Sequence, residues 1–278
     1  MNLLNILDEI EKVDAEVYER LNPRRNAMKQ FFNFGSKVAL AAVPMALGSM
    51  FKAAYGQSTA TVEQVLQYAL TLEYLEAEFY TKAVAAPGLI PAGAPLGAIT
   101  TIRDHENQHV AFLRTTITSL SKTPVAKPTF DFSAGNGSGT GPFASVFTNY
   151  DTFLAVAQVF EDTGVRAYKG QAPNLLRQGA VLTAALNIHS VEARHASHIR
   201  QMRKARGANV KPWITGKDNG IGLAAVQASY DGEELETQAG VKITGINGQA
   251  ISVSAATESF DEPLTMAQVL AIVDPFIV

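Results

Sequence analysis

The stretch LRQGAVLTAALNIHSVEARHASHIRQMRKARG, Leu176–Gly207, places an acid and an imidazole on the apolar side of a long helix. Its periodicity predicts a helix over about residues 174–206 that ends at Gly207. Glu192 and His195 are three positions apart, so they project from nearly the same side of that helix. The same side carries Ala185, Ile188, Ala196 and Ile199. The pattern therefore predicts that Glu192 and His195 point into the protein core.

The same pair of residue types occurs earlier, in the stretch IRDHENQHVAFL. Here Glu106 and His109 are also three positions apart, and their helix face carries Ile99, Ile102, Val110 and Leu113. A carboxylate and an imidazole in this arrangement can bind one metal ion together. The second pair is therefore also predicted to face the core.

Two further helical stretches each contain a single acid followed by a tyrosine. In LTLEYLEAEFY, Tyr80 follows Glu73, and in AQVFEDTGVRAY, Tyr168 follows Glu161 at the same spacing. That spacing corresponds to about two helical turns, so each tyrosine shares the face of its glutamate. The chain thus contains one helix pair twice, with the same chemical pattern in both copies.

The order of the helices predicts an all-α fold. Four long helices are expected, and Thr61 with Gln64 is a candidate capping box at the start of the first. Short links within each pair favour antiparallel neighbours, whereas the middle connection has roughly 20 residues. A four-helix bundle with one long crossover fits this order. The expected helices cover residues 61–86, 96–121, 143–169 and 174–206.

Four buried carboxylates would repel one another and would lose their hydration. Two divalent cations would balance their charge, and two neutral imidazoles would complete the set of ligands. The chain has no cysteine, which excludes thiolate ligands, disulfides and a cysteine nucleophile. Carboxylates with imidazoles suit iron or manganese. The sequence therefore predicts a centre of two iron ions, or alternatively two manganese ions.

These motifs together resemble the ferritin-like di-iron carboxylate superfamily, in which each of two helices supplies one Glu and each of two others a Glu-x-x-His pair. Within it, the sequence is similar to bacterial ferritin-like domain proteins of the desiccation-related type. The segments LTLEYLEAEFY and FDEPLT add to that similarity. The resemblance covers residues 61–206 and implies that Glu106 and Glu192 bridge the ions. The full set of ligands that it implies is Glu73, Glu106, His109, Glu161, Glu192 and His195.

Several neighbouring acids compete for these roles. Glu76 also has apolar neighbours, so it is an alternative to Glu73 as the ligand from the first helix. Tyr80 and the internal repeat favour Glu73. Glu78 is expected to be exposed, and Asp162 is expected to be a surface acid or a hydrogen-bonding partner of a ligand.

The remaining histidines and the two tyrosines have open roles. His189 lies one turn before Glu192, so it is either a partner of a ligand or a spare ligand. His105 and His198 are expected at the surface or at an interface. Tyr80 and Tyr168 are either core residues with bonded hydroxyls or participants in catalysis that hydrogen-bond the ligand carboxylates.

The segment of residues 1–57 differs from the rest of the chain. Arg24 and Arg25 precede an uncharged run from Val38 to Phe51, which is short for a membrane span but suits a signal peptide. The paired arginines resemble a twin-arginine export signal. We expect export to the periplasm, with transient membrane contact through this segment. The alternative is an uncleaved helical arm on a cytoplasmic protein.

Residues 207–278 are expected to cap the bundle, which itself covers residues 58–206. The stretch VKITGINGQAISVS alternates around Asn247-Gly248 and predicts a hairpin. The stretch FDEPLTMAQVLAIVDPFIV predicts one short helix, with Pro263 near its start and Pro275 at its end.

The formal net charge of −3 gives no reason to expect a nucleic-acid partner. The resemblance implies a redox enzyme that oxidises Fe(II) or reduces dioxygen or peroxide, with catalase-type chemistry as a neighbouring reaction. Its partners would be metal ions, the oxidant and copies of the same chain. The alternative is a stress-related or desiccation-related protein whose metal site does not turn over. A third hypothesis is a scaffold whose bundle has lost its metal.

Overall fold

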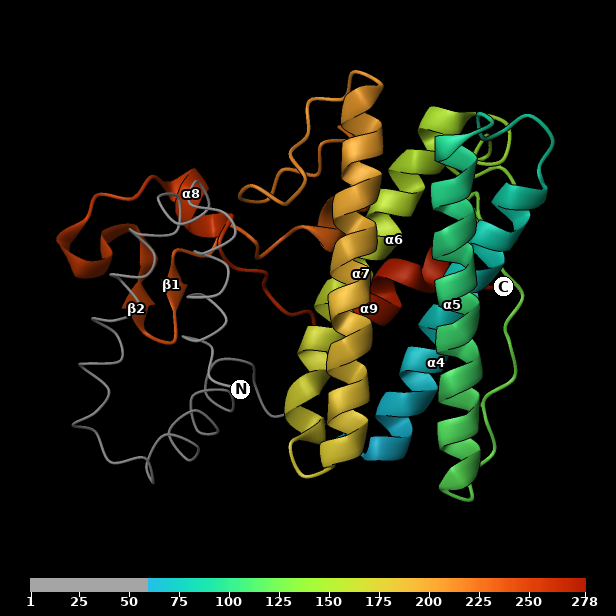
Figure 1. The fold of residues 1–278 in the computed structure, drawn as a ribbon, viewed down its shortest axis with the longest axis horizontal. Helices are drawn as coiled ribbons and strands as arrows, with labels where there is room; N and C mark the ends of the chain where they lie inside the picture. Colours follow the sequence, from blue (N-terminus) through green and yellow to red (C-terminus); the bar gives the residue numbers. More distant parts are fainter. Residues whose placement is uncertain (1–59) are drawn as a thin grey trace, which may run out of the picture. The chain divides into compact units, whose positions relative to one another are not determined.

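Four long helices form a bundle in the computed structural model, which describes residues 60–278 (Figure 1). Helix α4 packs along α5, and α6 packs along α7, as the short links predicted. Contacts between α4 and α6 and between α5 and α7 join the two pairs. The predicted bundle with one long crossover is therefore confirmed. The helices are α4 (Val62–Ala85), α5 (Ala94–Ser119), α6 (Tyr150–Gln171) and α7 (Gly179–Ala205).

The predicted N-terminal arm lies outside the described residues. The export signal inferred from the Arg24-Arg25 pair and the apolar run therefore stays a prediction. Within residues 60–278, no helix combines the length and the apolar character needed to cross a membrane.

The capping box at the start of α4 is confirmed. The backbone amide of Thr61 donates to Oε1 of Gln64 at 2.8 Å, and the amide of Gln64 donates to Oγ1 of Thr61 at 3.2 Å. Each side chain satisfies a backbone amide that the first helical turn leaves unpaired. The cap fixes where α4 begins, and with it the helical register of the acids further along.

The crossover, residues 120–149, is longer than predicted because α6 begins at Tyr150 and not near residue 143. Asn149 caps the helix by accepting a hydrogen bond from the amide of Thr152 at 2.9 Å. Phe143 and Val146, which the periodicity assigned to the helix, are instead buried residues of the loop. Their apolar character reflects packing of the crossover onto the bundle.

Aromatic contacts attach the crossover to α4. The ring of Phe79 lies 5.5 Å from that of Phe132 and 5.7 Å from that of Phe147, both in the crossover. Phe79 also stacks on Phe153 of α6, with the ring centres 5.1 Å apart. The Phe79 ring thus joins α4, the crossover and α6, next to Tyr80 in the sequence.

The predicted fourth helix is interrupted near its start. A short 3₁₀ helix, η1 (Ala172–Leu175), follows α6, and α7 begins only at Gly179. Pro173 lies in the first turn of η1, where its fixed backbone angle is tolerated.

The C-terminal part contains a hairpin and short helices, as predicted, but the hairpin is at a different place. The strands pair antiparallel around Ala239-Gly240, two residues each. Asn247 and Gly248 do form a tight turn with positive φ, closed by a hydrogen bond from the Gln249 amide to the Ile246 carbonyl. No ladder extends from this turn in the described part of the chain. The elements are η2 (Ala224–Ser229), β1 (Thr237–Gln238), β2 (Val241–Lys242), η3 (Ile243–Gly248), α8 (Val253–Thr257), α9 (Met266–Val273) and η4 (Asp274–Phe276).

A buried arginine of α6 connects the bundle to this C-terminal part. Arg166 is 1% exposed and lies 2.8 Å from a carboxylate oxygen of Glu233. Its guanidinium also donates to the backbone carbonyls of Ser229, Asp231 and Glu262. Helix α9 and η2 both contact α6. The C-terminal part therefore covers α6 and fixes its orientation.

Candidate metal centre

The structure brings the six residues of the predicted ligand set together in the middle of the bundle. Each helix contributes: Glu73 from α4, the Glu106/His109 pair from α5, Glu161 from α6 and the Glu192/His195 pair from α7. All four carboxylates are 0% exposed. Acids are almost never buried to this extent without a compensating charge, so the arrangement requires one.

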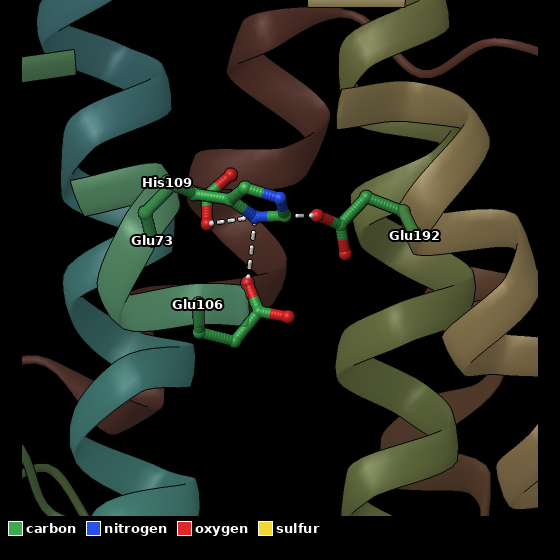
Figure 2. A group of neighbouring side chains, drawn as sticks. All are labelled: Glu73, Glu106, His109 and Glu192. Carbon is green, nitrogen blue, oxygen red and sulfur yellow. Dashed lines mark hydrogen bonds and ion pairs between the residues drawn. The ribbon is translucent and has the colours of Figure 1, made fainter. Parts of the chain in front are cut away.

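The first group surrounds the ring of His109 (Figure 2). Its Nδ1 atom lies 3.0 Å from Oε2 of Glu106, 3.2 Å from Oε2 of Glu73 and 3.3 Å from Oε1 of Glu192. The three carboxylates come from three different helices and converge on one nitrogen. A single cation placed among them would meet all four side chains.

The second group is the counterpart from the other half of the repeat. Nδ1 of His195 lies 2.9 Å from Oε1 of Glu106 and 3.3 Å from Oε2 of Glu161. In each group of four, one ligand atom per residue lies within 4.8 Å of the others. Glu106 and Glu192 belong to both groups. Two cations would therefore lie side by side with two carboxylates common to them.

The donor atoms themselves show that the protein alone does not satisfy this cluster. Within residues 60–278, neither carboxylate oxygen of Glu192 accepts a hydrogen bond, although Oε1 lies 3.3 Å from Nδ1 of His109. Oε2 of Glu161, Oε1 of Glu106 and Nδ1 of His195 are also buried without a hydrogen bond, although the last two lie close together. Buried polar atoms are rarely left in this state. Unpaired oxygen and nitrogen atoms on converging side chains fit a pair of hard or borderline cations.

The electrostatics of the cluster also indicate that it needs positive charge. Burial, followed by the charges of Glu106 and Glu73, raises the pKa of Glu192 well above its usual value. Burial also raises the pKa of Glu73, to about 7. Burial opposes protonation of His195, but Glu161 and Glu106 outweigh it and raise the pKa to about 11. Without metal, the cluster therefore holds protons in the place of cations.

Glu106 behaves differently from the other acids. Burial would raise its pKa, but contact with both His109 and His195 outweighs burial and lowers the pKa to about 2. It is the carboxylate that both imidazoles approach most closely, at 3.0 and 2.9 Å. An anion held at the centre of both groups is suited to lie between two cations.

The two tyrosines hydrogen-bond carboxylates of the cluster, but each bonds the glutamate of the opposite half. The Tyr80 hydroxyl donates to Oε1 of Glu161 at 2.5 Å. The Tyr168 hydroxyl donates to Oε1 of Glu73. Both tyrosines are buried, and burial raises the pKa of each hydroxyl well above its usual value. They therefore act as hydrogen-bond donors that fix the two terminal carboxylates.

The competing acids have three different environments. Glu76 is 4% exposed and lies beside the cluster, although it belongs to neither group of four. Glu78 is partly buried and pairs with Lys82 and Lys127, so it is less exposed than predicted. Asp162 is not a surface acid.

Asp162 belongs to a separate buried pair that the sequence did not reveal. It is 3% exposed, and both of its oxygens accept hydrogen bonds from Arg200, at 3.0 and 2.6 Å. Tyr230 also donates to it at 2.8 Å. The periodicity of α6 gave no indication of these partners, because Arg200 lies on another helix and Tyr230 lies in the distant C-terminal part.

The other histidines are divided between the cluster and its surroundings. His105 is partly buried, and its Nδ1 lies 2.9 Å from Nε2 of His195, so the expectation of a surface role was incomplete. His198 is exposed, as expected. His189 is not part of either group, and burial lowers its pKa near Lys169. His105 is thus the functional neighbour that sequence analysis missed, and its position one residue before Glu106 was the available indication.

An apolar pocket lies between the four helices next to the cluster. Its volume is about 20 Å³, and Tyr168, whose hydroxyl bonds Glu73, forms part of its wall. A cavity needs roughly 10–15 Å³ to hold one water molecule, so this pocket has room for one small molecule. Its apolar wall includes Leu66, Leu72, Leu113 and Ile188.

Comparison with known proteins assigns the chain to a family. No curated protein and no solved structure matches the chain significantly. The sequence model of the family described as "Ferritin-like domain" matches residues 61–205, which is just over half of the chain. The matched segment includes α4 to α7 and every residue of the two groups. On the strength of this match and of the bundle that carries it, the chain belongs to the ferritin-like domain family.

Proposed function

We propose that this protein binds two iron ions and uses them to oxidise Fe(II) with dioxygen. The observation that carries the proposal is that Glu106 and Glu192 belong to both groups of ligand atoms. Shared carboxylates hold two cations at a short separation, which allows both to act on one small molecule. Iron bound there would supply two electrons to an oxidant.

The side chains of the cluster would prepare the site for this chemistry. His109 and His195 must give up protons before they can bind cations, because their carboxylate neighbours raise the pKa of both rings. Tyr80 and Tyr168 hold Glu161 and Glu73 in place. The burial of all four carboxylates excludes bulk water and strengthens each electrostatic interaction.

The apolar pocket favours dioxygen over peroxide as the oxidant. Dioxygen is apolar and diatomic, and the pocket beside Tyr168 matches it in size and in the character of its wall. Peroxide would lose its hydrogen bonds to water on entering the same space. Peroxide reduction and the catalase-type reaction with manganese are therefore the secondary candidates for this site.

A second candidate function is metal binding without turnover, in a stress-related protein of the desiccation type. The observation that favours it is the buried Arg166 network, which ties α6 to the C-terminal part and stiffens the bundle. In this case the ions would replace the protons of the cluster and stabilise the fold. The resemblance of LTLEYLEAEFY and FDEPLT supports this subtype.

Anaerobic loading separates the two candidates. Metal-free protein is given two equivalents of Fe(II) and then mixed with air-saturated buffer, and absorption of the ferric product is followed. The redox proposal expects oxidation faster than that of free Fe(II), and Glu106→Gln abolishes the acceleration. Full iron occupancy with no acceleration would contradict the redox proposal and leave the second candidate.

We also propose export by the twin-arginine route, on the basis of Arg24-Arg25 and the apolar run that follows. Amino-terminal sequencing of the protein isolated from its native host tests this. A mature chain that begins after Phe51 supports export, and an intact Met1 contradicts it.

A further inference from the structure

The two halves of the cluster differ at one position. Glu76 follows Glu73 by three residues on α4, and the equivalent position on α6, three residues after Glu161, is Gly164. Helix α4 therefore has a second acid, Glu76, one turn after its candidate ligand Glu73. Helix α6 has no acid at the equivalent position, Gly164. The additional acid is 4% exposed, so it is part of the interior.

The glycine opposite Glu76 makes space for its carboxylate. A Cβ atom at position 164 would lie 3.4 Å from Oε1 of Glu76 and 3.3 Å from Oε2 of Glu192. The distance to Glu192 is tighter than most real Cβ contacts, and the distance to Glu76 is at the edge of ordinary van der Waals contact. Glycine inside a helix is unfavourable compared with alanine, so the space has a cost in stability. Glu76 and Glu192 thus approach the same small region beside Gly164.

The surroundings of Glu76 indicate which group it adjoins. Gly164, beside which Oε1 of Glu76 lies, is one turn after Glu161 on α6. Glu161 belongs only to the group that contains His195, whereas Glu192 belongs to both groups. In addition, Oε2 of Glu192 lacks a hydrogen-bond donor within residues 60–278, and Oε1 of Glu192 has only the ion pair with His109. A buried acid next to unpaired carboxylate oxygens is stable only if protons or cations neutralise both.

We propose that Glu76 is a seventh ligand of the metal centre and binds the cation held by Glu161 and His195. This inference rests on the proposed dinuclear site and adds an asymmetry to it. The cation of the His195 group would have one more carboxylate than the cation of the His109 group. The asymmetry arises from the Glu76/Gly164 difference between two otherwise matched helices.

The charge of the seventh ligand favours higher oxidation states. Four carboxylates balance two divalent cations, whereas two trivalent cations would leave an excess of two positive charges. The fifth carboxylate halves that excess. Glu76 would therefore stabilise the oxidised pair of ions relative to the reduced pair, and it would do so at one ion of the two.

Cobalt binding to metal-free protein tests the proposal. Wild type, Glu76→Gln and Glu78→Gln are titrated with Co(II), with calorimetry for the affinities and visible absorption for the coordination number. The wild type is expected to bind two ions. In Glu76→Gln, one of the two steps is expected to weaken by about ten- to hundredfold, the loss typical when a ligand or its direct partner is removed. The absorption of that ion should also intensify, because its coordination number falls.

The control and the remaining outcomes keep the two proposals distinguishable. Glu78 lies on the same helix but pairs with Lys82 and Lys127, so Glu78→Gln should bind both ions as the wild type does. Two unchanged steps and an unchanged spectrum in Glu76→Gln would overturn the seventh ligand and leave the dinuclear site intact. Fewer than two ions in the wild type would overturn the dinuclear site and the seventh ligand with it.

Anomalous diffraction at the cobalt edge gives a test that needs no variant. In crystals of the cobalt-loaded wild type, a Glu76 oxygen should lie at ligand distance, about 2.0–2.2 Å, from one of two cobalt positions. Two cobalt ions held by the other six residues, with the Glu76 carboxylate turned away, would refute the assignment.

Discussion

The hydroxyl of Tyr80, on α4, donates a 2.5 Å hydrogen bond to Oε1 of Glu161, on α6. The reciprocal bond runs from Tyr168 of α6 to Glu73 of α4. Each half of the internal repeat therefore positions the terminal carboxylate of the other half. The candidate metal centre and the contact between the two helix pairs are formed by the same residues.

Replacing Tyr80 by Phe should weaken both the fold and metal binding. Oε1 of Glu161 would lose its donor in a fully buried position, which typically costs about 1–3 kcal/mol. Metal affinity should fall by about ten- to hundredfold, because a group that orients a ligand is lost. Urea denaturation of the metal-free variant and metal titration measure the two effects.

Tyr74→Phe is the matched control for Tyr80→Phe. Tyr74 is also a buried tyrosine of α4, but its hydroxyl accepts a hydrogen bond from Arg114. Its loss should leave metal affinity unchanged. Equal losses of affinity in the two variants would show that Tyr80 has no specific role at the centre.

Glu106→Gln and Glu161→Gln should differ in metal stoichiometry. Both acids are 0% exposed and both substitutions preserve shape, but Glu106 belongs to both groups and Glu161 to one. We expect Glu106→Gln to lose both ions and Glu161→Gln to retain one. Elemental analysis of chelator-free preparations gives the counts, and equal counts would contradict the shared role of Glu106.

The melting temperature of the metal-free protein should fall as the pH rises. Burial raises the pKa of Glu73 to about 7, whereas an unfolded chain titrates near 4.3. A raised pKa gives stability that is complete below about pH 4.3 and is lost as the pH rises through about 7. His195, with its pKa raised to about 11, acts in the same direction above about pH 6.5.

Bound metal should reverse this dependence. Cations bind the deprotonated carboxylates and imidazoles, so metal affinity, and with it the stabilisation, increases with pH. Thermal melts at several pH values, with chelator and with excess Mn(II), measure the difference. A metal-free melting temperature that rises between pH 5 and 7 would contradict the charge state inferred for Glu73.

Filling the apolar pocket should slow oxidation by dioxygen. Ala69 lies in the pocket wall, and Ala69→Leu would occupy part of the space at a cost of about 1–3 kcal/mol in stability. Oxidation of bound Fe(II) by dioxygen should slow several-fold. Oxidation of the same variant by hydrogen peroxide is the internal control and should change less, and an equal slowing would argue against the pocket as the route.

Arg166→Met should detach the C-terminal part from α6. The substitution leaves Glu233 buried without its partner, which typically costs about 3–5 kcal/mol. Arg206→Met, at the exposed pair with Asp151, should cost less than about 1 kcal/mol. Urea denaturation and limited proteolysis of residues 207–278 compare the two, and similar losses would contradict the assigned role of Arg166.

The helices and the convergence of the six residues could be predicted because they depend on local periodicity. A spacing of three positions fixes Glu106 and His109 on one side of a helix whatever the rest of the fold, and the apolar neighbours indicate which side is buried. The short links then determine which helices are neighbours. The family match and the two groups of donors rest on these local patterns.

The errors arose where a distant partner decides the outcome. Asp162 was expected to be a surface acid or a hydrogen-bonding partner of a ligand, because its partners, Arg200 and Tyr230, cannot be inferred from the periodicity of α6. Phe143 continued an apolar pattern, although its packing belongs to the crossover. Asn247-Gly248 formed the turn that its residues favour, but a turn alone does not supply pairing for the strands beside it.

The reciprocal tyrosine bonds have a consequence for how the chain can be divided. A cut in the exposed stretch after α5 would give two helical hairpins, each with three of the six candidate ligands and one of the two tyrosines that bond them. Neither hairpin would contain the donor for its own terminal carboxylate. Co-expressed fragments would therefore be expected to reassociate in the presence of metal, as the two subunits of a dimer do. In the intact chain, the crossover is a peptide tether between these two subunit-like halves.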